Sequence, residues 1–485
     1  MILVNANQMR SLDAAATELG IDSSVLMENA AIAMTDEILK EKPESVLIFT
    51  GKGQNAGDGF ACARHLYNKG INTEIIMLAP PESLSGSALK NYEIDMAVGI
   101  KTAPFSTSAN YTADVIVDCI LGIGFKGELS GDYKDAVCKI NSSGAYVIAA
   151  DIPSGISADN GKISGICVKA NKTVTFGFAK LGLYSPLSID FVGEVAVKDI
   201  SIPKCLPQIS SIEAYLLTKD EIFMPAISKA AHKGTNGRVA IAGGSDGKLG
   251  AVILAQKAAL YSGAGLVTCL VPERLEAPLM THIESAMCAA LEEADFSKYD
   301  SVLIGNGLGT SSVAYNVLQR AIKTAEKTIV IDADGINLLA ENKDILKYKK
   351  GDVILTPHPL EFARLCGLDT SEVIENRVEL ASEFAQKYGV TVVLKGAYTV
   401  VASSSGKTYT NTTGNEGMAK GGSGDVLAGM TAGLAPKFEN AFKTAFTAVY
   451  LHGLAGDIAA EKVGKISMTA SDIAENISDA FKKMY

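Results

Sequence analysis

Long hydrophobic runs, paired cysteines and a secretion signal are all missing from this chain of 485 residues. No stretch approaches the roughly 20 consecutive apolar residues that a membrane span needs. The first residues, MILVNANQMRSLDAAATELG, lack the basic start and apolar run of a signal peptide. The eight cysteines are scattered, without a CxxC pair or a Cys/His group at zinc-ligand spacing. We therefore expect reduced thiols, a cytoplasmic location and no membrane partner.

The chain also lacks an excess of positive charge. Its formal net charge of −10 disfavours binding to nucleic acids and to anionic membranes, although a basic pocket for phosphates can lie inside an acidic protein. Apolar residues make up 47% and charged residues 20% of the chain, a composition that buries large cores and excludes disorder. The length favours more than one domain. We expect a globular, two-domain protein that forms a homo-oligomer.

Short apolar runs alternate with helical patterns along the whole chain. The runs are SVLIFTG, NTEIIML, ADVIVD and AYVIAAD in the first half, and GRVAIAGG, GLVTCLV, SVLIG, TIVIDAD, DVILTPH and VTVVLKG in the second. This rhythm predicts parallel sheets with helices on both faces, with helices expected from about Asp58, around Ala88 and from Gly250. A proline-containing polar stretch places the boundary near Ile212, which predicts two α/β domains over residues 1–212 and 213–485.

A glycine-rich stretch, GGSGDVLAG, precedes a helix in the second half. Its residues Gly421 to Gly424 can point backbone N–H groups at one anion, and glycine lets a phosphate approach the backbone closely. Asp425 directly follows them. A carboxylate in a first helical turn is worth about 0.3 to 1 kcal/mol as a structural cap. A cap does not require four small residues before it, however, and a base beside a bound phosphate does. We therefore interpret Asp425 as a catalytic base.

The stretch GGSGDVLAGM resembles the signature of ribokinase-like enzymes, in which the aspartate activates a substrate hydroxyl and the glycines hold the transferring phosphoryl group. The rest of this half is similar to the nucleotide-dependent dehydratase that repairs hydrated NADH and NADPH. The matching segments lie between Ala231 and about Gly433 and are HKGTNGRVAIAGGSDGKLGAV, SGAGLV, GNGLG, DADGINLL, TPHPLEFARL, LKGAYT and NTTGNEGMAKGGSGD. The resemblance implies a ribokinase-like α/β domain over residues 213–485.

The same resemblance assigns residues to two ligands. It implies that the hydrated dinucleotide contacts Ala251, Gly307, His358 and Asp425, whereas the adenine nucleotide contacts Lys395, Gly396, Ala397, Tyr398, Thr399 and Gly424. Taken singly, several of these residues have structural alternatives, such as a loop histidine or a turn glycine. Bacterial and archaeal members of the family use ADP and eukaryotic members use ATP, so we expect ADP with magnesium, and ATP as the alternative. The sequence departs from the family at Asn306, where proline is usual, Leu360, where glycine is usual, and Ser423, where threonine is common.

Three loops of the first half carry glycines or carboxylates after predicted strands. The first, KGQNAGDGFACARHL, has neither the GxGxxG spacing of a dinucleotide fold nor that of a P-loop, and indicates only anion binding at a helix start. The others, VDCILGIGFKGELSG and AADIPSGISADNG, place Asp118 and Asp151 at the ends of strands. A lone carboxylate there is often a helix cap. Three loops at one edge of a sheet are better explained by a binding site.

These loops resemble the NAD(P)HX epimerase family, whose motifs are GNNGGDG, DxxxGTG and DIPSG. The match runs from about Gln8 to Val197 and implies a Rossmann-like, three-layer epimerase domain over residues 1–212. Asp151 is the candidate acid or base. The resemblance implies that a potassium ion is bound by Asn55, Asp118 and Ser154, and that substrate contacts Gln54, Asn55, Ala56, Gly57, Asp58, Gly122, Ile123, Gly124, Phe125, Lys126, Gly127, Glu128 and Asp151. The departures here are Gln54 for asparagine, Ala56 for glycine and Ile123 for threonine.

The two resemblances together predict a bifunctional repair enzyme for hydrated NADH and NADPH. The first domain would interconvert the R and S hydrates, and the second would dehydrate the S form while ADP gives AMP and phosphate. One alternative is a vitamin-precursor or sugar kinase fused to a nucleotide-binding domain. Another is that the first domain is a non-catalytic binding scaffold.

Overall fold

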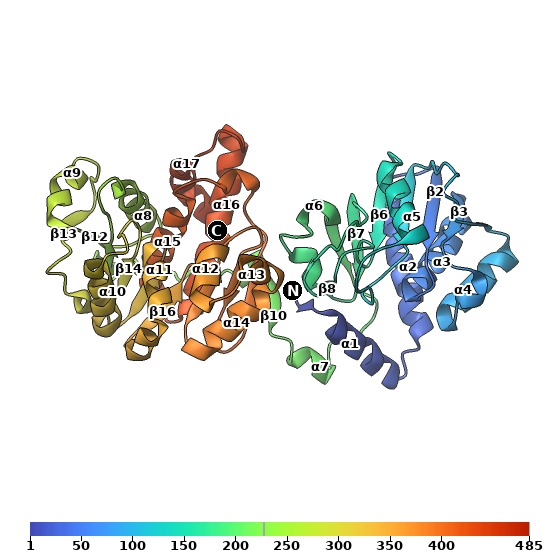
Figure 1. Cartoon of the computed structure of the whole chain (residues 1–485), viewed down its shortest axis with the longest axis horizontal. Coiled ribbons are helices and arrows are strands. Elements are labelled where there is room, and N and C mark those ends of the chain that lie inside the picture. Colours follow the sequence, from blue (N-terminus) through green and yellow to red (C-terminus); the bar gives the residue numbers. More distant parts are fainter. Residues whose placement is uncertain (227, 485) are drawn as a thin grey trace. The chain divides into compact units, whose positions relative to one another are not determined.

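The structure, a computed structural model, describes residues 1–226 and 228–484 and divides into two compact units. Unit 1 is Met1–Glu213 and unit 2 is Ala214–Tyr485 (Figure 1). The division lies one residue beyond the boundary inferred from the sequence. Each unit has its own sheet and its own buried core.

Unit 1 is built on a parallel sheet. Within residues 1–213, which are described without a gap, this sheet has seven strands in the order β4-β3-β2-β5-β6-β7-β9. The strands are β2 (Ser45–Thr50), β3 (Asn72–Met77), β4 (Lys101–Pro104), β5 (Val115–Cys119), β6 (Tyr146–Ala150), β7 (Lys172–Phe176) and β9 (Glu194–Lys198). A second, short parallel pair joins β1 (Leu3–Val4) to β8 (Ala179–Lys180).

Helices cover both faces of this sheet. They are α1 (Ala6–Glu18), α2 (Ser23–Lys40), α3 (Gln54–Asn68), α4 (Gly86–Val98), α5 (Gly131–Ser142), α6 (Ile189–Val192) and α7 (Pro207–Ser210), with 3-10 turns η1 (Pro81–Ser83) and η2 (Leu181–Tyr184). Alternate residues of β2 enter different cores: Val46 and Ile48 pack with α1, α2 and α3, whereas Leu47 and Phe49 pack with α5. The three-layer α/β arrangement predicted for this half is therefore observed.

Unit 2 has a larger sheet. Among residues 214–226 and 228–484 the sheet has ten strands in the order β10-β19-β18-β17-β16-β15-β14-β11-β12-β13. All neighbours are parallel except β18, which is antiparallel to β17 and β19. The strands are β10 (Ala214–Leu217), β11 (Arg238–Ala242), β12 (Leu266–Val271), β13 (Met287–Ala290), β14 (Ser301–Ile304), β15 (Thr328–Ile331), β16 (Asp352–Leu355), β17 (Thr391–Leu394), β18 (Val400–Ala402) and β19 (Thr408–Asn411).

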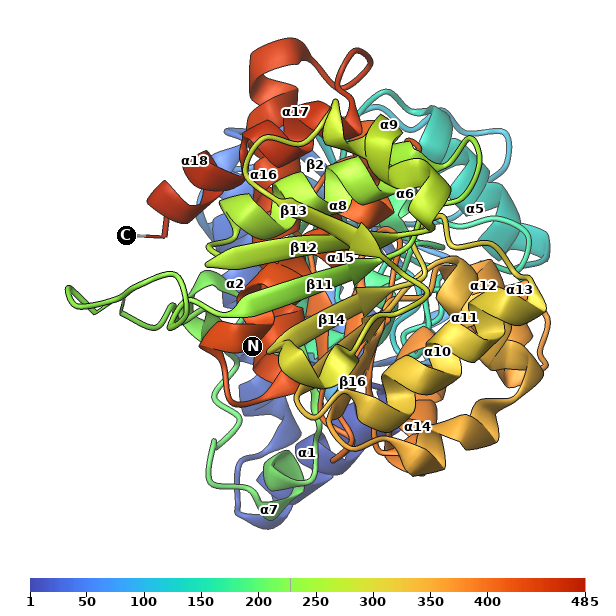
Figure 2. The same cartoon turned by 90° about the vertical axis from the view of Figure 1, so that its left-hand side faces the viewer.

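Two groups of helices pack on opposite faces of this sheet, as Figure 2 shows for α8 and α10. The first group is α8 (Leu249–Tyr261), α9 (Glu276–Met280), α15 (Ser423–Leu434), α16 (Ala441–Val463), α17 (Ala470–Glu475) and α18 (Ile477–Lys482). The second is α10 (Ser312–Thr324), α11 (Asp334–Glu341), α12 (Pro359–Cys366), α13 (Thr370–Glu375) and α14 (Arg377–Tyr388). The 3-10 turns are η3 (Lys219–Glu221), η4 (Glu273–Leu275), η5 (Phe296–Lys298), η6 (Lys343–Tyr348), η7 (Glu416–Met418) and η8 (Ala435–Lys437).

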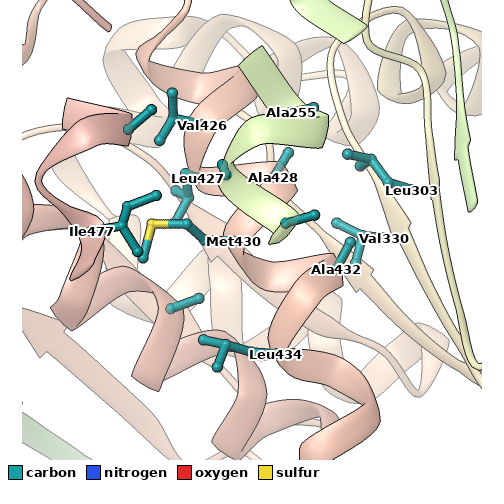
Figure 3. Close-up of a cluster of buried hydrophobic side chains, with 14 of the residues drawn as sticks. Ala255, Leu303, Val330, Val426, Leu427, Ala428, Met430, Ala432, Leu434 and Ile477 are labelled. Carbon is teal, nitrogen blue, oxygen red and sulfur yellow. The ribbon is translucent and has the colours of Figure 1, made fainter. Parts of the chain in front are cut away.

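Helix α15 lies inside the protein rather than on its surface. All its residues from Val426 to Leu434 are buried. Figure 3 shows its side chains in one cluster with Ala255 of α8, the strand residues Leu303 and Val330, and Ile477 of α18. A helix that is apolar on all sides requires such an interior position. Its first turn is thereby fixed over the middle of the sheet.

The structure corrects two expected helix starts. Helix α3 begins at Gln54 rather than near Asp58, because the predicted glycine-rich turn already forms the first helical turn. Helix α15 begins at Ser423, so Ser423 and Gly424 belong to the helix and only Gly421 and Gly422 precede it. Gly422 has a φ of 93°, a left-handed conformation that favours glycine. In residues 1–226 and 228–484, no helix has both the length and the apolar character needed to cross a membrane.

The contact between α15 and α8 yields a stability prediction. A Cβ atom added at Gly429 would lie 2.2 Å from the carbonyl oxygen of Ala255, so Gly429→Ala must push the two helices apart. We expect a loss of about 1 to 3 kcal/mol, the usual cost of overpacking a core. Gly250→Ala, on the exposed side of α8 with no atom within 4 Å of the new methyl group, should be neutral or stabilising. Urea unfolding of both variants measures the difference, and equal stabilities would contradict the close contact.

Candidate functional site

The first candidate site lies at the carboxyl edge of the unit 1 sheet. Asp118, in β5, is fully buried and accepts hydrogen bonds from Ser154 Oγ at 2.7 Å and from the backbone N–H groups of Ser154 at 2.7 Å and Ile120 at 3.1 Å. Burial raises the pKa of the Asp118 carboxyl to about 6, and the bonds from Ser154 oppose that rise. The structure therefore brings Asp118 and Ser154 together, as the proposed ion site requires.

Asn55 joins this pair from helix α3. Its Nδ2 donates to the carbonyl of Leu121 at 2.9 Å, and the Ser154 hydroxyl accepts from the Leu121 N–H at 2.9 Å. The Asn55 Oδ1 atom is buried and has no hydrogen-bond partner within the described part of the chain. An unpartnered buried oxygen beside a carboxylate and a hydroxyl fits a cation that prefers oxygen ligands. These three residues are thus a chemically suitable set for the predicted potassium ion.

Asp151, directly after β6, is held in a strained conformation. Its φ is 65°, which is rare for a residue with a side chain. Its Oδ1 accepts from Thr175 Oγ1 at 3.0 Å, from the Phe176 N–H at 3.2 Å and from the ammonium of Lys180. Lys180 is 1% exposed and also donates to the Phe176 carbonyl at 2.9 Å. The backbone and a buried cation together fix the carboxylate of Asp151.

Two more carboxyl groups interact electrostatically with this ion pair. Burial raises the pKa of Asp13, on α1, to about 6, with the Lys180 charge opposing the rise and the Asp151 charge adding to it. Burial, followed by the Asp151 charge, raises the pKa of Asp58 well above its ordinary value. The Lys180 ammonium therefore interacts with three carboxyl groups, those of Asp151, Asp13 and Asp58. Such a cluster keeps a proton available near neutral pH, which a site for proton transfer needs.

The predicted substrate loops meet at the same place. A Cβ atom added at Gly122 would lie 3.4 Å from the Asn55 Cβ atom, so the start of α3 and the loop after β5 are in contact. Arg10 of α1 reaches this loop and donates to the Ile123 carbonyl at 3.5 Å. In the rest of the loop, Phe125 packs against the core while four residues are exposed, namely Gly124, Lys126, Gly127 and Glu128.

The second candidate site is at the first turn of α15. Asp425 is the third residue of this helix, and its Oδ1 accepts a hydrogen bond from Asn306 Nδ2 at 2.6 Å. The carboxylate does not cap its own helix, which has no side-chain capping bond in the structure. Burial raises the pKa of Asp425 above its ordinary value, and the bond from Asn306 opposes the rise. This geometry favours a reactive role over the capping role.

A buried network lies behind Asp425. Asn306 Nδ2 also donates to Asp332 Oδ2 at 2.9 Å, and Asp332 Oδ1 accepts from Thr356 Oγ1 at 2.8 Å and from Lys395 Nζ at 2.6 Å. Asp332 follows β15 and is 1% exposed. Burial disfavours the charge of Lys395, but Asp332 and then Glu361 outweigh it and raise the pKa of the ammonium. Lys395 is therefore held as a cation at the carboxyl edge of the sheet.

Contacts connect several of the predicted ligand-binding residues. A Cβ atom at Gly424 would lie 3.4 Å from Lys395 Nζ, and one at Gly307 would lie 3.6 Å from the Ala251 Cβ atom. The segment from Lys395 to Thr399 is a tight turn, in which the Thr399 hydroxyl donates to the Gly396 carbonyl at 2.9 Å. Tyr398, within this turn, has a φ of 54°, and its neighbours Gly396 and Ala397 are exposed.

His358 has a structural role beside its predicted contact with substrate. Its Nδ1 accepts from the Glu361 N–H at 3.3 Å, and the Glu361 carboxylate accepts from the His358 N–H at 2.8 Å, which caps helix α12. Burial and the Lys395 charge lower the pKa of His358, whereas burial raises the pKa of Glu361 to about 7. Leu360, a departure from the family pattern, is 44% exposed, so its side chain does not fill the site.

Several residues of these networks have no signal in the sequence that assigns them to a site. Lys180, Asp13 and Asp332 lie on elements remote from their partners, so neither spacing nor a local motif indicated the contacts. Asn306 differs in the sequence only by standing where the family usually has proline. The alternation of strands and helices could have directed attention to Asp332, because it follows a buried strand of a parallel sheet.

Both halves of the chain are similar to known proteins. Residues 239–479 match the family model described as NAD(P)H-hydrate dehydratase, and residues 23–182 match the model described as YjeF-related protein N-terminus. A relative from Moorella thermoacetica, named bifunctional NAD(P)H-hydrate repair enzyme Nnr, is 37% identical over 98% of this chain and 96% of its own length. The chain belongs to the family of bifunctional NAD(P)H-hydrate repair enzymes. A member of this family from Coxiella burnetii is 35% identical over 97% of this chain and 98% of its own length.

Solved structures support the ribokinase-like fold of unit 2. An ADP/ATP-dependent NAD(P)H-hydrate dehydratase from Bacillus subtilis, co-crystallized with ATP and Mg²⁺, is 29% identical with a TM-score of 0.52, covering 56% of this chain and 99% of that chain. A ribokinase-like superfamily protein from Enterococcus faecalis V583 is 31% identical with a TM-score of 0.51, covering 56% of this chain and 96% of that chain. The predicted fold of the second half is thus confirmed.

The Lys180–Asp151 pair in this repair enzyme yields a prediction. Lys180→Met leaves the Asp151 carboxylate, whose side chain is 14% exposed, without its cation. Loss of one partner of a fully buried pair typically costs about 3 to 5 kcal/mol, and the partial exposure of Asp151 should keep the loss below that range. Adding Asp151→Asn to this variant should restore part of the loss, because no uncompensated charge then remains. Lys90→Met, on the exposed face of α4, is the control. Amide hydrogen exchange of strands β6 and β7 measures the effect, and unchanged protection in Lys180→Met would contradict it.

Proposed function

We propose that unit 1 interconverts the R and S hydrates of NADH and NADPH, and that unit 2 dehydrates the S form at the expense of ADP, giving AMP and phosphate. ATP is the alternative donor. Membership of the repair-enzyme family over the full length supports both activities. The observation that carries the assignment of residues is the carboxylate of Asp425, which is free of any capping bond to its own helix and lies at the start of α15.

Dehydration requires a better leaving group than hydroxide. The oxygen of the substrate's C6 hydroxyl attacks the terminal phosphorus of the nucleotide, and Asp425 accepts the proton of that hydroxyl. The bond from that phosphorus to the leaving nucleotide then breaks. Phosphate next departs from C6 while a proton leaves the neighbouring ring carbon, which restores the dihydropyridine. The protein supplies the base and the position of the two reactants, and the nucleotide supplies the driving force.

The phosphates of the nucleotide have a prepared site. The N–H groups at the start of α15, with Gly421 and Gly422 before them, can bind the transferring phosphoryl group, and the Lys395 ammonium lies beside Gly424. Magnesium would neutralise phosphate charge and typically binds through substrate phosphates with one or two carboxylates. In residues 1–226 and 228–484, no group of three His, Cys, Asp or Glu side chains forms a separate metal site.

Epimerisation requires a reversible change at C6, which carries a hydroxyl next to the ring nitrogen. Either transient loss of the hydroxyl or ring opening exchanges the two faces, and both routes need proton transfer. Asp151 accepts or returns the proton, held in place by Lys180 and Thr175. Asn55, Asp118 and Ser154 would hold a potassium ion, which would offset the negative charge of substrate phosphates. The loops that start at Gln54 and Gly122 would contact the dinucleotide.

The competing function is a kinase that acts on a stable alcohol. Such an enzyme would release a phosphoester, whereas the dehydratase releases inorganic phosphate and a reduced nicotinamide. Incubation of mixed R and S hydrates with ADP or ATP separates the two, because only the dehydratase restores the absorbance of the reduced ring.

The expected homo-oligomer and the cytoplasmic location stay predictions. Light scattering and cell fractionation test them.

Asp425→Asn tests the catalytic base. The variant keeps the size of the side chain but cannot accept a proton, so dehydration should fall by about 10² to 10⁴, the typical contribution of a placed base. Nucleotide affinity should be retained. Because burial raises the pKa of Asp425, the wild-type rate should fall as the pH drops through that raised value, as the base takes up a proton. Single-turnover kinetics and calorimetric nucleotide binding measure these effects.

Asp472→Asn is a matched control for this experiment. Asp472 is also the third residue of its helix, α17, where it forms a reciprocal capping box with Thr469. The substitution should lower stability by about 1 kcal/mol and leave dehydration unchanged. If Asp425→Asn instead behaved like Asp472→Asn, with normal turnover and a small loss of stability, the catalytic assignment would be wrong.

Asp118→Asn tests the potassium site. Loss of the carboxylate charge should weaken cation and substrate binding together, because the ion offsets repulsion between phosphates and carboxylates. We expect a higher potassium requirement for epimerisation, measured with potassium replaced by choline at constant ionic strength. Asp132→Asn, at the exposed start of α5, should leave the requirement unchanged. A wild-type potassium dependence in Asp118→Asn would exclude the metal role.

A further inference from the structure

Asn306 lies between the two carboxylates of the unit 2 site. It follows strand β14 and is fully buried. Its Nδ2 lies 2.6 Å from Asp425 Oδ1 and 2.9 Å from Asp332 Oδ2, so its two amide protons can be donated to two different carboxylates. The resemblance to the dehydratase family predicts proline at this position. Proline has no side-chain donor, so these bonds belong to this chain.

The surroundings of Asn306 determine the orientation of its amide. An oxygen facing two carboxylates would be repelled by both, so the amide nitrogen must face them. Thr356 and Lys395 donate to the other oxygen of Asp332. Asp332 therefore cannot turn away without losing these bonds. Asn306 is consequently an anchored donor, and its bond restricts the position of the Asp425 carboxylate.

We propose that Asn306 is a positioning residue for dehydration, which aims the Asp425 carboxylate at the substrate hydroxyl and shields it from the charge of Asp332. The proposal rests on the proposed dehydratase function. It adds a residue that acts through Asp425. The bond occupies Oδ1 of Asp425, and the second oxygen is left to accept the proton from the hydroxyl. Without the amide, repulsion from Asp332 and Asp334 would favour the protonated carboxyl, in which that oxygen cannot act as a base.

The positioning role of Asn306 predicts a change in the pH dependence of the dehydration rate. The base acts only when it is ionised, so dehydration is lost as the pH falls through the pKa of Asp425. Burial raises this pKa most, the bond from Asn306 lowers it, and among the charged neighbours Asp332 and Asp334 raise it while Lys395 lowers it. In Asn306→Ala the pKa should therefore rise, and the acid limb of the profile should move to higher pH. Loss of a hydrogen bond to a charged group should reduce the dehydration rate of Asn306→Ala roughly 10- to 100-fold.

The experiment uses the full chain, the S hydrate of NADH and ADP in single turnovers from pH 5 to 9. Asn306→Ala should show the lower rate and the displaced acid limb, while calorimetric ADP affinity changes less than about threefold, since Asn306 donates to no phosphate-binding group. Asn306→Asp is isosteric but replaces the donor with a further carboxylate, so the limb should move at least as far. This variant keeps the test valid if the cavity in Asn306→Ala prevents folding.

Asn476→Ala is the matched control. Asn476 is also a buried asparagine of unit 2 and donates to the Asp472 carbonyl at 2.8 Å, away from Asp425. It should lose stability without moving the pH profile. A wild-type acid limb in both Asn306 variants, or an equal displacement in Asn476→Ala, would overturn the positioning role. If the wild-type chain restored no reduced nicotinamide with ADP or ATP, the dehydratase function itself would be wrong.

Discussion

The close contact of helix α15 with helix α8 is the constraint on which the second site depends. Cβ atoms at Gly429 and Gly433 would lie 2.2 Å and 2.5 Å from carbonyl oxygens of α8, so only glycine permits this separation of the helix axes. With both helices packed on the sheet, the first turn of α15 has one position (Figure 3). The glycines after Asp425 therefore serve the packing. Gly422, before it, also has a structural reason to be glycine, because its φ is 93° and an added Cβ would lie 2.6 Å from Leu254 Cδ1.

Both units place a buried lysine beside a carboxylate, but they use the pair differently. In unit 1 the Lys180 ammonium bonds directly to Asp151, the residue proposed to transfer protons. In unit 2 Lys395 bonds to Asp332 and an amide separates that pair from Asp425. A base that bonded directly to Lys395 would compete with the nucleotide phosphates for the same cation. The inserted amide removes this competition, since the ammonium stays beside Gly424 at the proposed phosphate site.

The alternation of apolar runs predicted β2, β3, β5 and β6 in unit 1 and β11, β12 and β14 to β17 in unit 2, because buried parallel strands have a strong local signal. It did not predict β7, although all residues of this strand are buried and Thr175 and Phe176 bond to Asp151. The strands β4, β9, β10, β13, β18 and β19 also lie outside the prediction; β4, β9 and β13 have no fully buried residue and therefore lack that signal. Asp118, Asp151 and Asp425 could be predicted from their position at the carboxyl end of a strand or beside a glycine-rich helix start. Lys180 and Asn306 could not. Lys180 reaches Asp151 only because β8 pairs with β1 beside the main sheet, and such a tertiary contact leaves no pattern in the sequence.

The departures from the family pattern differ in physical kind. Ala56 is fully buried in the unit 1 core, and Ile123 is partly buried and packs against the same core. These two substitutions therefore exchange one packing group for another. The neighbouring Gly57 has less freedom, because an added Cβ would displace the end of the Met27 side chain and lie 3.1 Å from the backbone Cα atom of Ala88. Asn306 instead introduces a polar group into a buried site, where an unused donor would be costly. Both amide protons have carboxylate partners, whereas the Asn306 Oδ1 atom is buried and has no hydrogen-bond partner within the described residues. The substitution therefore acts on the charge of the base rather than on the packing around it.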